Sequence, residues 1–232
     1  SPFWLVHPLL CENVTVRTLI LRSHGSTNDG CDPESCTDVL IEGCYFDTGD
    51  DCIAIKSGKD NDGRRWNIPS KDILIRNCIM RDGHAGVAIG SEISGSVYNV
   101  TVQDCYMDSP NLDRVLRIKS NPARGGEVAN VRVKNIEVGE CKLAIVGLEL
   151  KYWYTDKGPY MPSFHDIYVE NVRSKKSRYM IHVDGLEGKE LAKDIYFKDC
   201  NINGVTEKEV NHLVGVGKIA FDNVTVNGVK QK

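Results

Sequence analysis

Acidic residues and one histidine recur at equivalent points of a repeating sequence. Asp29, the pair Asp50 and Asp51, and His84 each precede a short apolar segment. Glycosidic bonds are cleaved by two carboxyl groups, of which one protonates the leaving oxygen while the other activates water or attacks the sugar. Crowded carboxylates raise one another's pKa, which keeps one of them protonated. These residues therefore predict the carboxyl cluster of a glycoside hydrolase, with His84 tuning its proton.

A pair of cations follows in the next repeat. Arg117 and Lys119 flank Ile118, and because side chains alternate along a strand, both cations point away from the core. Guanidinium and ammonium groups in this position can hold a sugar carboxylate. Asn28 and Lys56 are two further predicted contacts to substrate.

Each of these signals has a plainer interpretation when it is taken alone. Asp-Asp and Asn-Asp-Gly are typical of turns, and Arg-x-Lys on a strand is often only a solvated face. Their coincidence in consecutive repeats favours the functional interpretation. Segment 59–66 (KDNDGRRW) is either a substrate-contacting loop or a solvated one. It lacks the Glu of an EF-hand, so no metal or other cofactor is predicted.

A nine-residue repeat defines the elements that must position these groups. Each copy alternates aliphatic and other residues, which predicts a short β-strand. One such strand cannot bury its apolar face, whereas stacked copies can, so the array predicts a solenoid. The copies begin at Asn13, Asp38, Asp72, Asn99, Asn130, Asp166, Asp194 and Lys218.

Two positions of the repeat predict how the coils stack. The sixth is usually Asn or Asp, whose side chains can hydrogen-bond along the axis at a turn. The seventh is apolar and predicts an inward ladder of Leu19, Cys44, Cys78, Cys105, Ile136, Val172, Cys200 and Val224. Four of the nine cysteines fall in this ladder, and we interpret these four as small buried apolar residues rather than disulfide partners.

A second apolar segment follows most copies, so each coil has at least two strands. These segments are 52–56, 86–90, 115–119, 143–146 and 180–183. The sequence thus predicts an all-β parallel β-helix of about eight coils that forms a single domain over residues 1–232. Because neighbouring coils lie about 4.8 Å apart, we expect the carboxyl groups roughly 5–9 Å apart, which spans both retaining and inverting hydrolysis.

Composition argues against several classes of protein. The 232-residue chain has a formal net charge of −3, unlike a general nucleic-acid binder. Its apolar runs, such as 143–150, are too short to span a bilayer, and no signal peptide is visible. Because solenoid ends need caps and none precedes the first copy, we expect a C-terminal portion of a longer chain that lacks N-terminal coils.

Four short motifs together resemble the polygalacturonase family, glycoside hydrolase family 28. Members carry Asn-Thr-Asp, Gly-Asp-Asp, Gly-His-Gly and Arg-Ile-Lys, in that order, on a right-handed parallel β-helix. The second and fourth motifs are intact, the first keeps its aspartate, and the third ends in alanine. Here they read Thr27-Asn28-Asp29, Gly49-Asp50-Asp51, Gly83-His84-Ala85 and Arg117-Ile118-Lys119.

The resemblance implies inverting hydrolysis of α-1,4-galacturonide linkages in pectin. Asp50 is then the general acid, while Asp29 and Asp51 position and deprotonate the water. His84 supports the proton of the acid, and the two cations bind the galacturonate carboxylate. A tyrosine that the family often adds has no obvious match, because Tyr152 is out of register.

Other functions use the same fold and stay open at this point. Segment 86–92 looks more like exo-acting members. A rhamnogalacturonan hydrolase, a calcium-dependent pectate lyase and a non-catalytic carbohydrate-binding or structural β-helix are the alternatives, and the Asp-rich site with a histidine favours hydrolysis. Pectin lies outside cells, so we expect a secreted or periplasmic monomer with no nucleic-acid or membrane partner.

Overall fold

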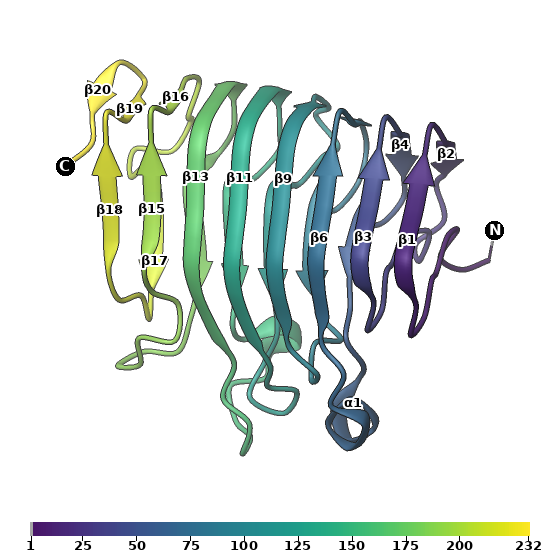
Figure 1. Ribbon diagram of the computed structural model, residues 1–232. Coiled ribbons are helices and arrows are strands. Elements are labelled where there is room, and N and C mark those ends of the chain that lie inside the picture. Colours follow the sequence, from purple (N-terminus) through teal and green to yellow (C-terminus); the bar gives the residue numbers. More distant parts are fainter. Residues whose placement is uncertain (1) are drawn as a thin grey trace.

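The computed structural model describes residues 2–232 as a stack of parallel coils, a right-handed parallel β-helix as predicted (Figure 1). Two sheets run the length of the stack. The larger sheet contains β1 (Glu12–Arg17), β2 (Ile20–Ser23), β3 (Thr37–Glu42), β4 (Tyr45–Thr48), β6 (Ser70–Arg76), β7 (Ile79–Met80), β9 (Val97–Met107), β11 (Glu127–Glu140), β13 (Ser163–Lys176), β15 (Ile195–Lys198), β16 (Asn201–Ile202), β18 (Ile219–Asp222), β19 (Thr225–Val226) and β20 (Val229–Lys230). Only the last pair, β19 with β20, is antiparallel among the described strand pairs.

The smaller sheet is formed by the second strands that the sequence predicts, with one more at its C-terminal end. It contains β5 (Ile53–Ile55), β8 (Val87–Gly90), β10 (Arg114–Lys119), β12 (Ala144–Glu149), β14 (Tyr179–Asp184) and β17 (Asn211–Val214). Each strand pairs with its equivalent in the next coil, so Arg117 lies beside Ala88 on one side and Gly147 on the other. This register places residues of consecutive coils in rows along the outer face.

Asn and Asp residues turn the chain at the corners of each coil. The predicted ladder at the sixth position is present, since Asn171 Nδ2 donates to Asn135 Oδ1 at 2.9 Å and Asn135 Nδ2 donates to Asp104 Oδ1 at 2.9 Å. A second ladder, which we did not predict, links the first positions, where Asn130 bonds to Asn99 at 2.7 Å. These residues have φ between 50° and 57°, a left-handed conformation that Asn and Asp tolerate best among residues with side chains.

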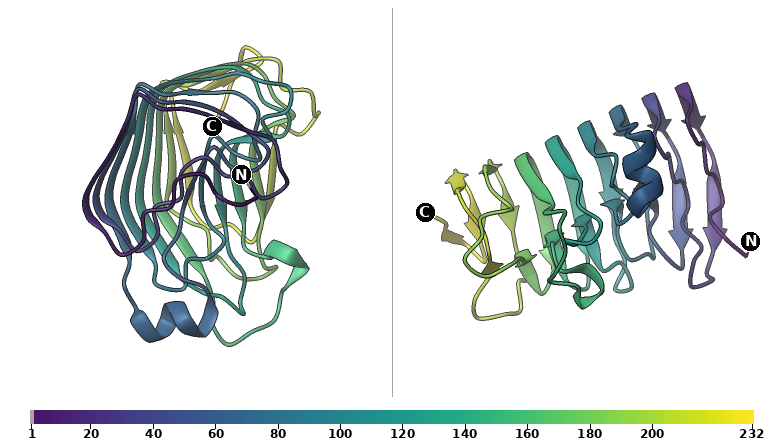
Figure 2. Two further views of the ribbon diagram at one scale, coloured as in Figure 1. Left: turned by 90° about the vertical axis from the view of Figure 1, so that its right-hand side faces the viewer. Right: turned by 90° about the horizontal axis from the view of Figure 1, so that it is seen from below.

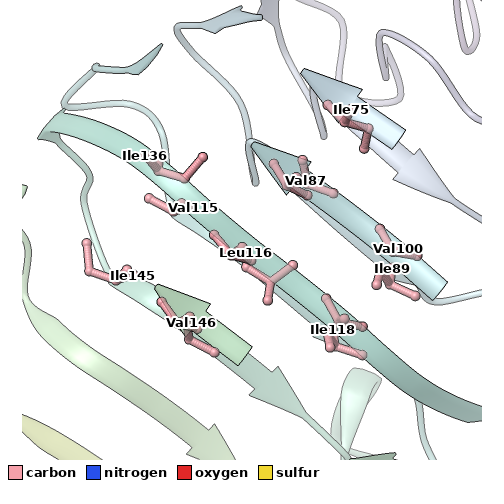
Figure 3. Close-up of a cluster of buried hydrophobic side chains, with 14 of the residues drawn as sticks. Ile75, Val87, Ile89, Val100, Val115, Leu116, Ile118, Ile136, Ile145 and Val146 are labelled. Atoms are coloured by element: carbon pink, nitrogen blue, oxygen red, sulfur yellow. The ribbon is translucent and has the colours of Figure 1, made fainter. Parts of the chain in front are cut away.

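Apolar side chains from both sheets fill the space between them. Figure 3 shows Ile75, Val100 and Ile136 of the larger sheet and Leu116 and Val146 of the smaller one within the same cluster of buried side chains. All nine cysteines are free, which confirms the interpretation of the four in the ladder. Residues of the ladder are buried except Leu19, which is 39% exposed. The prediction was wrong there because Leu19 lies in the first described coil, where no further coil covers it.

Segment 59–66 is not a loop. Residues Asp60–Trp66 form the helix α1, which projects from one edge of the stack together with the segment around the short 3-10 helix η1 (Tyr152–Tyr154) (Figure 2). Arg64 ties these segments together, since its Nη1 donates to Arg124 O at 2.8 Å and its guanidinium lies 3.8 Å from the centre of the Tyr160 ring. Among residues 2–232 there is no helix with the length and apolar character needed to cross a membrane.

Core burial predicts a stability difference between two isoleucines of one coil. Ile75→Ala should lower the free energy of unfolding by about 2–5 kcal/mol, because Ile75 is fully buried and its removal leaves a cavity. Ile79→Ala, at a 43% exposed position four residues on, should change it by less than about 0.5 kcal/mol. Chemical denaturation of both variants measures the difference, and equal losses would contradict the packing described here.

Candidate active site

Tight turns on adjacent coils bring the acidic residues together. Asp29 lies in the turn after β2, and Asp50 and Asp51 lie between β4 and β5. The backbone N–H of Gly30 donates to the carbonyl of Asp51 at 3.0 Å. A Cβ at Gly30 would overlap the backbone oxygen of Cys52, so only glycine permits this approach of the two turns.

Three carboxyl groups converge at this point. One oxygen of each of Asp29, Asp50 and Asp51 lies within 4.8 Å of the others. Lys119 Nζ lies 2.6 Å from Asp51 Oδ2, and His84 Nδ1 lies 2.9 Å from Asp50 Oδ1. One oxygen of each residue approaches the others this closely because the side chains converge from two adjacent turns.

The electrostatic environments of the three acids differ. Burial, followed by the charge of Asp51, raises the pKa of Asp29 to about 7. Burial also favours the neutral form of Asp50, but the hydrogen bond to His84 and the charge of Lys119 outweigh it and lower the pKa of Asp50. Burial, helped by the charges of Asp51 and Asp50, therefore raises the pKa of Asp29 in the free site, whereas the pKa of Asp50, the acid that the family resemblance implies, is lowered.

The contact between His84 and Asp50 predicts a pH-dependent stability. The hydrogen bond with Asp50 raises the pKa of His84 above 6.5, so its contribution is present below pH 6.5 and is lost as the pH rises through the raised value. The lowered pKa of Asp50 gives a contribution that is present above pH 3.8 and lost as the pH falls. His84→Ala should therefore lower the melting temperature more at about pH 5 than at about pH 8. An equal change at both pH values would contradict a charged pair.

Arg117, one of the two predicted carboxylate-binding cations, meets an acid that we did not predict. Arg117 donates to Glu149 through Nε at 3.1 Å and through Nη2 at 2.9 Å, and Arg114 Nη2 lies 2.7 Å from the same carboxylate. Glu149 is the partner of Lys119 in the parallel register. Aligning the second strands by coil would therefore have revealed Glu149 from the sequence.

A tyrosine also lies over the cations. The centre of the Tyr152 ring is 5.6 Å from the Arg117 guanidinium and 5.4 Å from Lys119 Nζ. Tyr152 reaches this position from the η1 turn, beyond the end of β12, which is why register along the strands did not identify it. Beyond it lies a pocket of about 370 Å³ lined by Arg114, Arg117, Glu149, Lys151, Tyr152, Trp153, His182 and Asp184.

Asn28 and Lys56, the two other predicted substrate contacts, are held by contacts inside the protein. The amide of Asn28 accepts hydrogen bonds from Ser23 Oγ at 2.6 Å and Gly25 N at 2.8 Å, so it shapes the turn that carries Asp29. Lys56 is buried, and its ammonium faces carboxylates inside the protein. Substrate contact by either side chain stays a prediction.

Two groups of side chains have atoms close enough to ligate a cation. The first is the cluster of Asp29, Asp50 and Asp51, where Lys56 and Lys119 already supply positive charge. The second joins three residues beside a pocket of about 260 Å³ near His84, and its acids already bond to neighbouring side chains. Its members are His24, Asp47 and Asp82.

A parallel β-helix that carries a carboxyl cluster, a histidine bound to one acid and adjacent cations has the features of a glycoside hydrolase site. The family model of glycosyl hydrolases family 28 matches residues 1–218, and the chain belongs to this family. A hyperthermoactive exopolygalacturonase from Thermotoga maritima has a similar structure, with a TM-score of 0.92 and 38% identity over 99% of this chain and 50% of that one.

Curated relatives carry related names. A probable polygalacturonase from Vitis vinifera is 35% identical over 147 residues, which cover 62% of this chain and 30% of the relative. An exo-poly-alpha-D-galacturonosidase from Dickeya chrysanthemi is 25% identical over 94% of this chain and 37% of the relative. The chain thus spans about a third of the length of these two relatives.

Proposed function

We propose that the chain hydrolyses α-1,4-galacturonide linkages of pectin. The main support for this proposal is that the three acids of the cluster lie side by side but have different environments. Asp51 is anchored by Lys119, Asp50 is bonded to His84, and Asp29 is buried beside them. Such an arrangement gives the neighbouring acids different environments, so that one can act as the acid and another as the base of a single-step hydrolysis.

Asp50 is the proposed general acid, which gives its proton to the leaving oxygen. In the free site the charge of Lys119 helps to lower the pKa of Asp50. A bound galacturonate brings a carboxylate towards Lys119 and Arg117, which offsets that positive charge. The pKa of Asp50 then rises, and the protonated acid is favoured when substrate is present.

Asp51 is the proposed base. Lys119 holds Oδ2 of this carboxylate, while its buried Oδ1 accepts no hydrogen bond from the described residues. A water bonded to Oδ1 attacks the sugar carbon and transfers its proton to Asp51 as the glycosidic bond breaks. Asp29, within 4.8 Å of the other acids, accepts the second hydrogen bond of this water.

The positive charges of Arg117 and Lys119 favour an anionic sugar as the substrate. Glu149 occupies Nε and Nη2 of Arg117, which leaves the Nη1 edge and Lys119 to bind the carboxylate of galacturonate. Tyr152 packs over both cations and limits their movement. These contacts favour galacturonate over a neutral sugar such as rhamnose at this position.

Product analysis tests the proposal. The purified chain is incubated with de-esterified polygalacturonate, in parallel with and without a chelator, and the products are separated by size. Saturated galacturonate products support hydrolysis, with monomer from the start for the exo action that we propose. Unsaturated products that disappear with chelator would indicate a lyase, and binding without cleavage would indicate a non-catalytic domain. We also propose that the protein is secreted or periplasmic and that it acts as a monomer.

A further inference from the structure

One buried carboxyl group beside the cluster has no role in the mechanism above. Asp32 follows Asp29 by three residues and is fully buried. Neither of its side-chain oxygens receives a hydrogen bond from an N–H or O–H group of the described residues. An ionised carboxylate in this state is costly, because burial removes its hydration and no donor replaces it.

The ammonium of Lys56 is the positive charge next to Asp32, but it also faces two other acids and so does not fully compensate an ionised Asp32. Lys56 Nζ is closest to Glu92 Oε2, at 3.1 Å. The same ammonium lies 3.4 Å from Asp32 Oδ2 and 3.8 Å from Asp29 Oδ2. Trp4 covers it, with the ring centre 4.3 Å from Nζ. A single cation therefore faces three acids in a place that solvent hardly reaches.

Contact between Asp32 and Asp29 indicates where a proton is held. Both carboxyl groups approach the same ammonium, since Lys56 Nζ lies 3.4 Å from Asp32 Oδ2 and 3.8 Å from Asp29 Oδ2. Two neighbouring carboxyl groups can hydrogen-bond to each other only when one of them is protonated. Burial raises the pKa of both acids, that of Asp29 to about 7 and that of Asp32 well above 3.8. Their mutual hydrogen bond raises the pKa of Asp32 and lowers that of Asp29. The other titratable groups that act on the pair are Lys56, Asp50, Asp51 and Cys31.

We propose that Asp32 is a neutral carboxylic acid whose O–H donates a hydrogen bond to Asp29 and holds Asp29 in position as an anion. Asp32 is thus a positioning residue, since it touches no reacting atom. Asp29 gains a fixed orientation and an acceptor oxygen aimed at the cluster. The effect on catalysis rests on the proposed function, whereas the protonation of Asp32 does not.

Two substitutions separate a neutral Asp32 from an ionised one. Asp32→Asn keeps a neutral group of the same shape with an N–H donor, so the pH profile of kcat/KM on polygalacturonate should keep its position. Asp32→Leu removes the donor and raises the pKa of Asp29, so the acidic limb should move by about one to two pH units to higher pH. A shift of the Asp32→Asn profile to lower pH would overturn the proposal, because it would reveal a lost negative charge.

A spectroscopic measurement needs no substrate and still applies if Asp32→Leu does not fold. Carbon-13 NMR of the chain labelled at aspartate Cγ, at about pH 7, should contain a carboxylic acid resonance that disappears in Asp32→Asn, whereas the signal of Asp29, which titrates at about 7, remains. Its absence from the wild-type protein would overturn the inference even if the chain hydrolyses galacturonan. Its presence in a chain without activity would instead leave the inference standing and contradict the proposed function.

Discussion

Asp50→Asn should reduce kcat on polygalacturonate by about 10²–10⁴-fold, with little change in KM. Asparagine has the size of aspartate but no proton to give to the leaving oxygen, and a positioned general acid contributes about this factor. The substitution leaves the turn intact, since the amide oxygen of the new side chain can still accept from the backbone N–H of Asp51, now at 3.0 Å from Asp50 Oδ1. Initial rates over a range of substrate concentrations separate kcat from KM.

Asp47→Asn is the matched control for this variant. Asp47 lies on β4, is partly exposed and contacts His24 at 3.0 Å, outside the carboxyl cluster. Its substitution should leave kcat unchanged. If Asp50→Asn kept wild-type activity, the acid would have to be another member of the cluster, and Asp29, with its pKa raised to about 7, would be the first to test.

Lys119→Met should destabilise the protein by about 3–5 kcal/mol and also abolish most activity. Both members of the pair with Asp51 are nearly fully buried, at 6% and 1% side-chain exposure. Removing the ammonium leaves a buried carboxylate without its counter-ion, which is the costly way to break such a pair. Chemical denaturation measures the free energy of unfolding, and the hydrolysis assay measures the activity.

Two further variants separate these effects. The double variant Asp51→Asn/Lys119→Met removes both charges and should recover much of the stability but none of the activity. Lys142→Met, at an exposed lysine that pairs with Asp113 at 3.3 Å, should change stability by less than about 1 kcal/mol. A Lys119→Met protein as stable as wild type would show that Asp51 does not depend on this partner.

The nine-residue repeat was sufficient to predict the fold, because both the alternation of aliphatic residues and the recurrence of the pattern can be seen directly in the sequence. Alternating aliphatic residues indicate strands, and the recurrence of the same strand pattern indicates that successive coils stack to bury one face of each strand. The ladder from Cys44 to Val224 follows from that geometry, and its single error, Leu19, lies where the stack of described coils begins. The left-handed Asn and Asp corners were only half recognised, since the ladder through Asn99 and Asn130 was missed.

The acids of the site were predictable for a related reason, because equivalent residues of successive coils must lie side by side. Their protonation was not, since the pKa values of Asp29 and Asp50 depend on burial and on contacts with His84 and Lys119. Tyr152 was missed because a turn outside the repeat carries it. The helix α1 was missed because seven residues rich in Asp, Gly and Arg carry no apolar periodicity.

The short distance between the three acids of the cluster bears on the stereochemistry of the reaction. One oxygen of each of Asp29, Asp50 and Asp51 lies within 4.8 Å of the others. The carboxyl groups of inverting enzymes are usually about 6.5–9.5 Å apart. In the proposed mechanism the water bonds to Asp51 and Asp29 at one side of the cluster, so no gap between acid and base is needed. Hydrolysis of the α-linkage should then release the β-anomer.

Proton NMR of galacturonan oligomers, recorded from the first minutes of reaction with the purified chain, tests this account most directly. Inverting hydrolysis should give saturated products whose new reducing end first appears as the β-anomer and only later equilibrates with the α-anomer. The α-anomer appearing first would contradict it, because a covalent glycosyl-enzyme intermediate on one of the aspartates would then be required. Unsaturated products would contradict hydrolysis altogether.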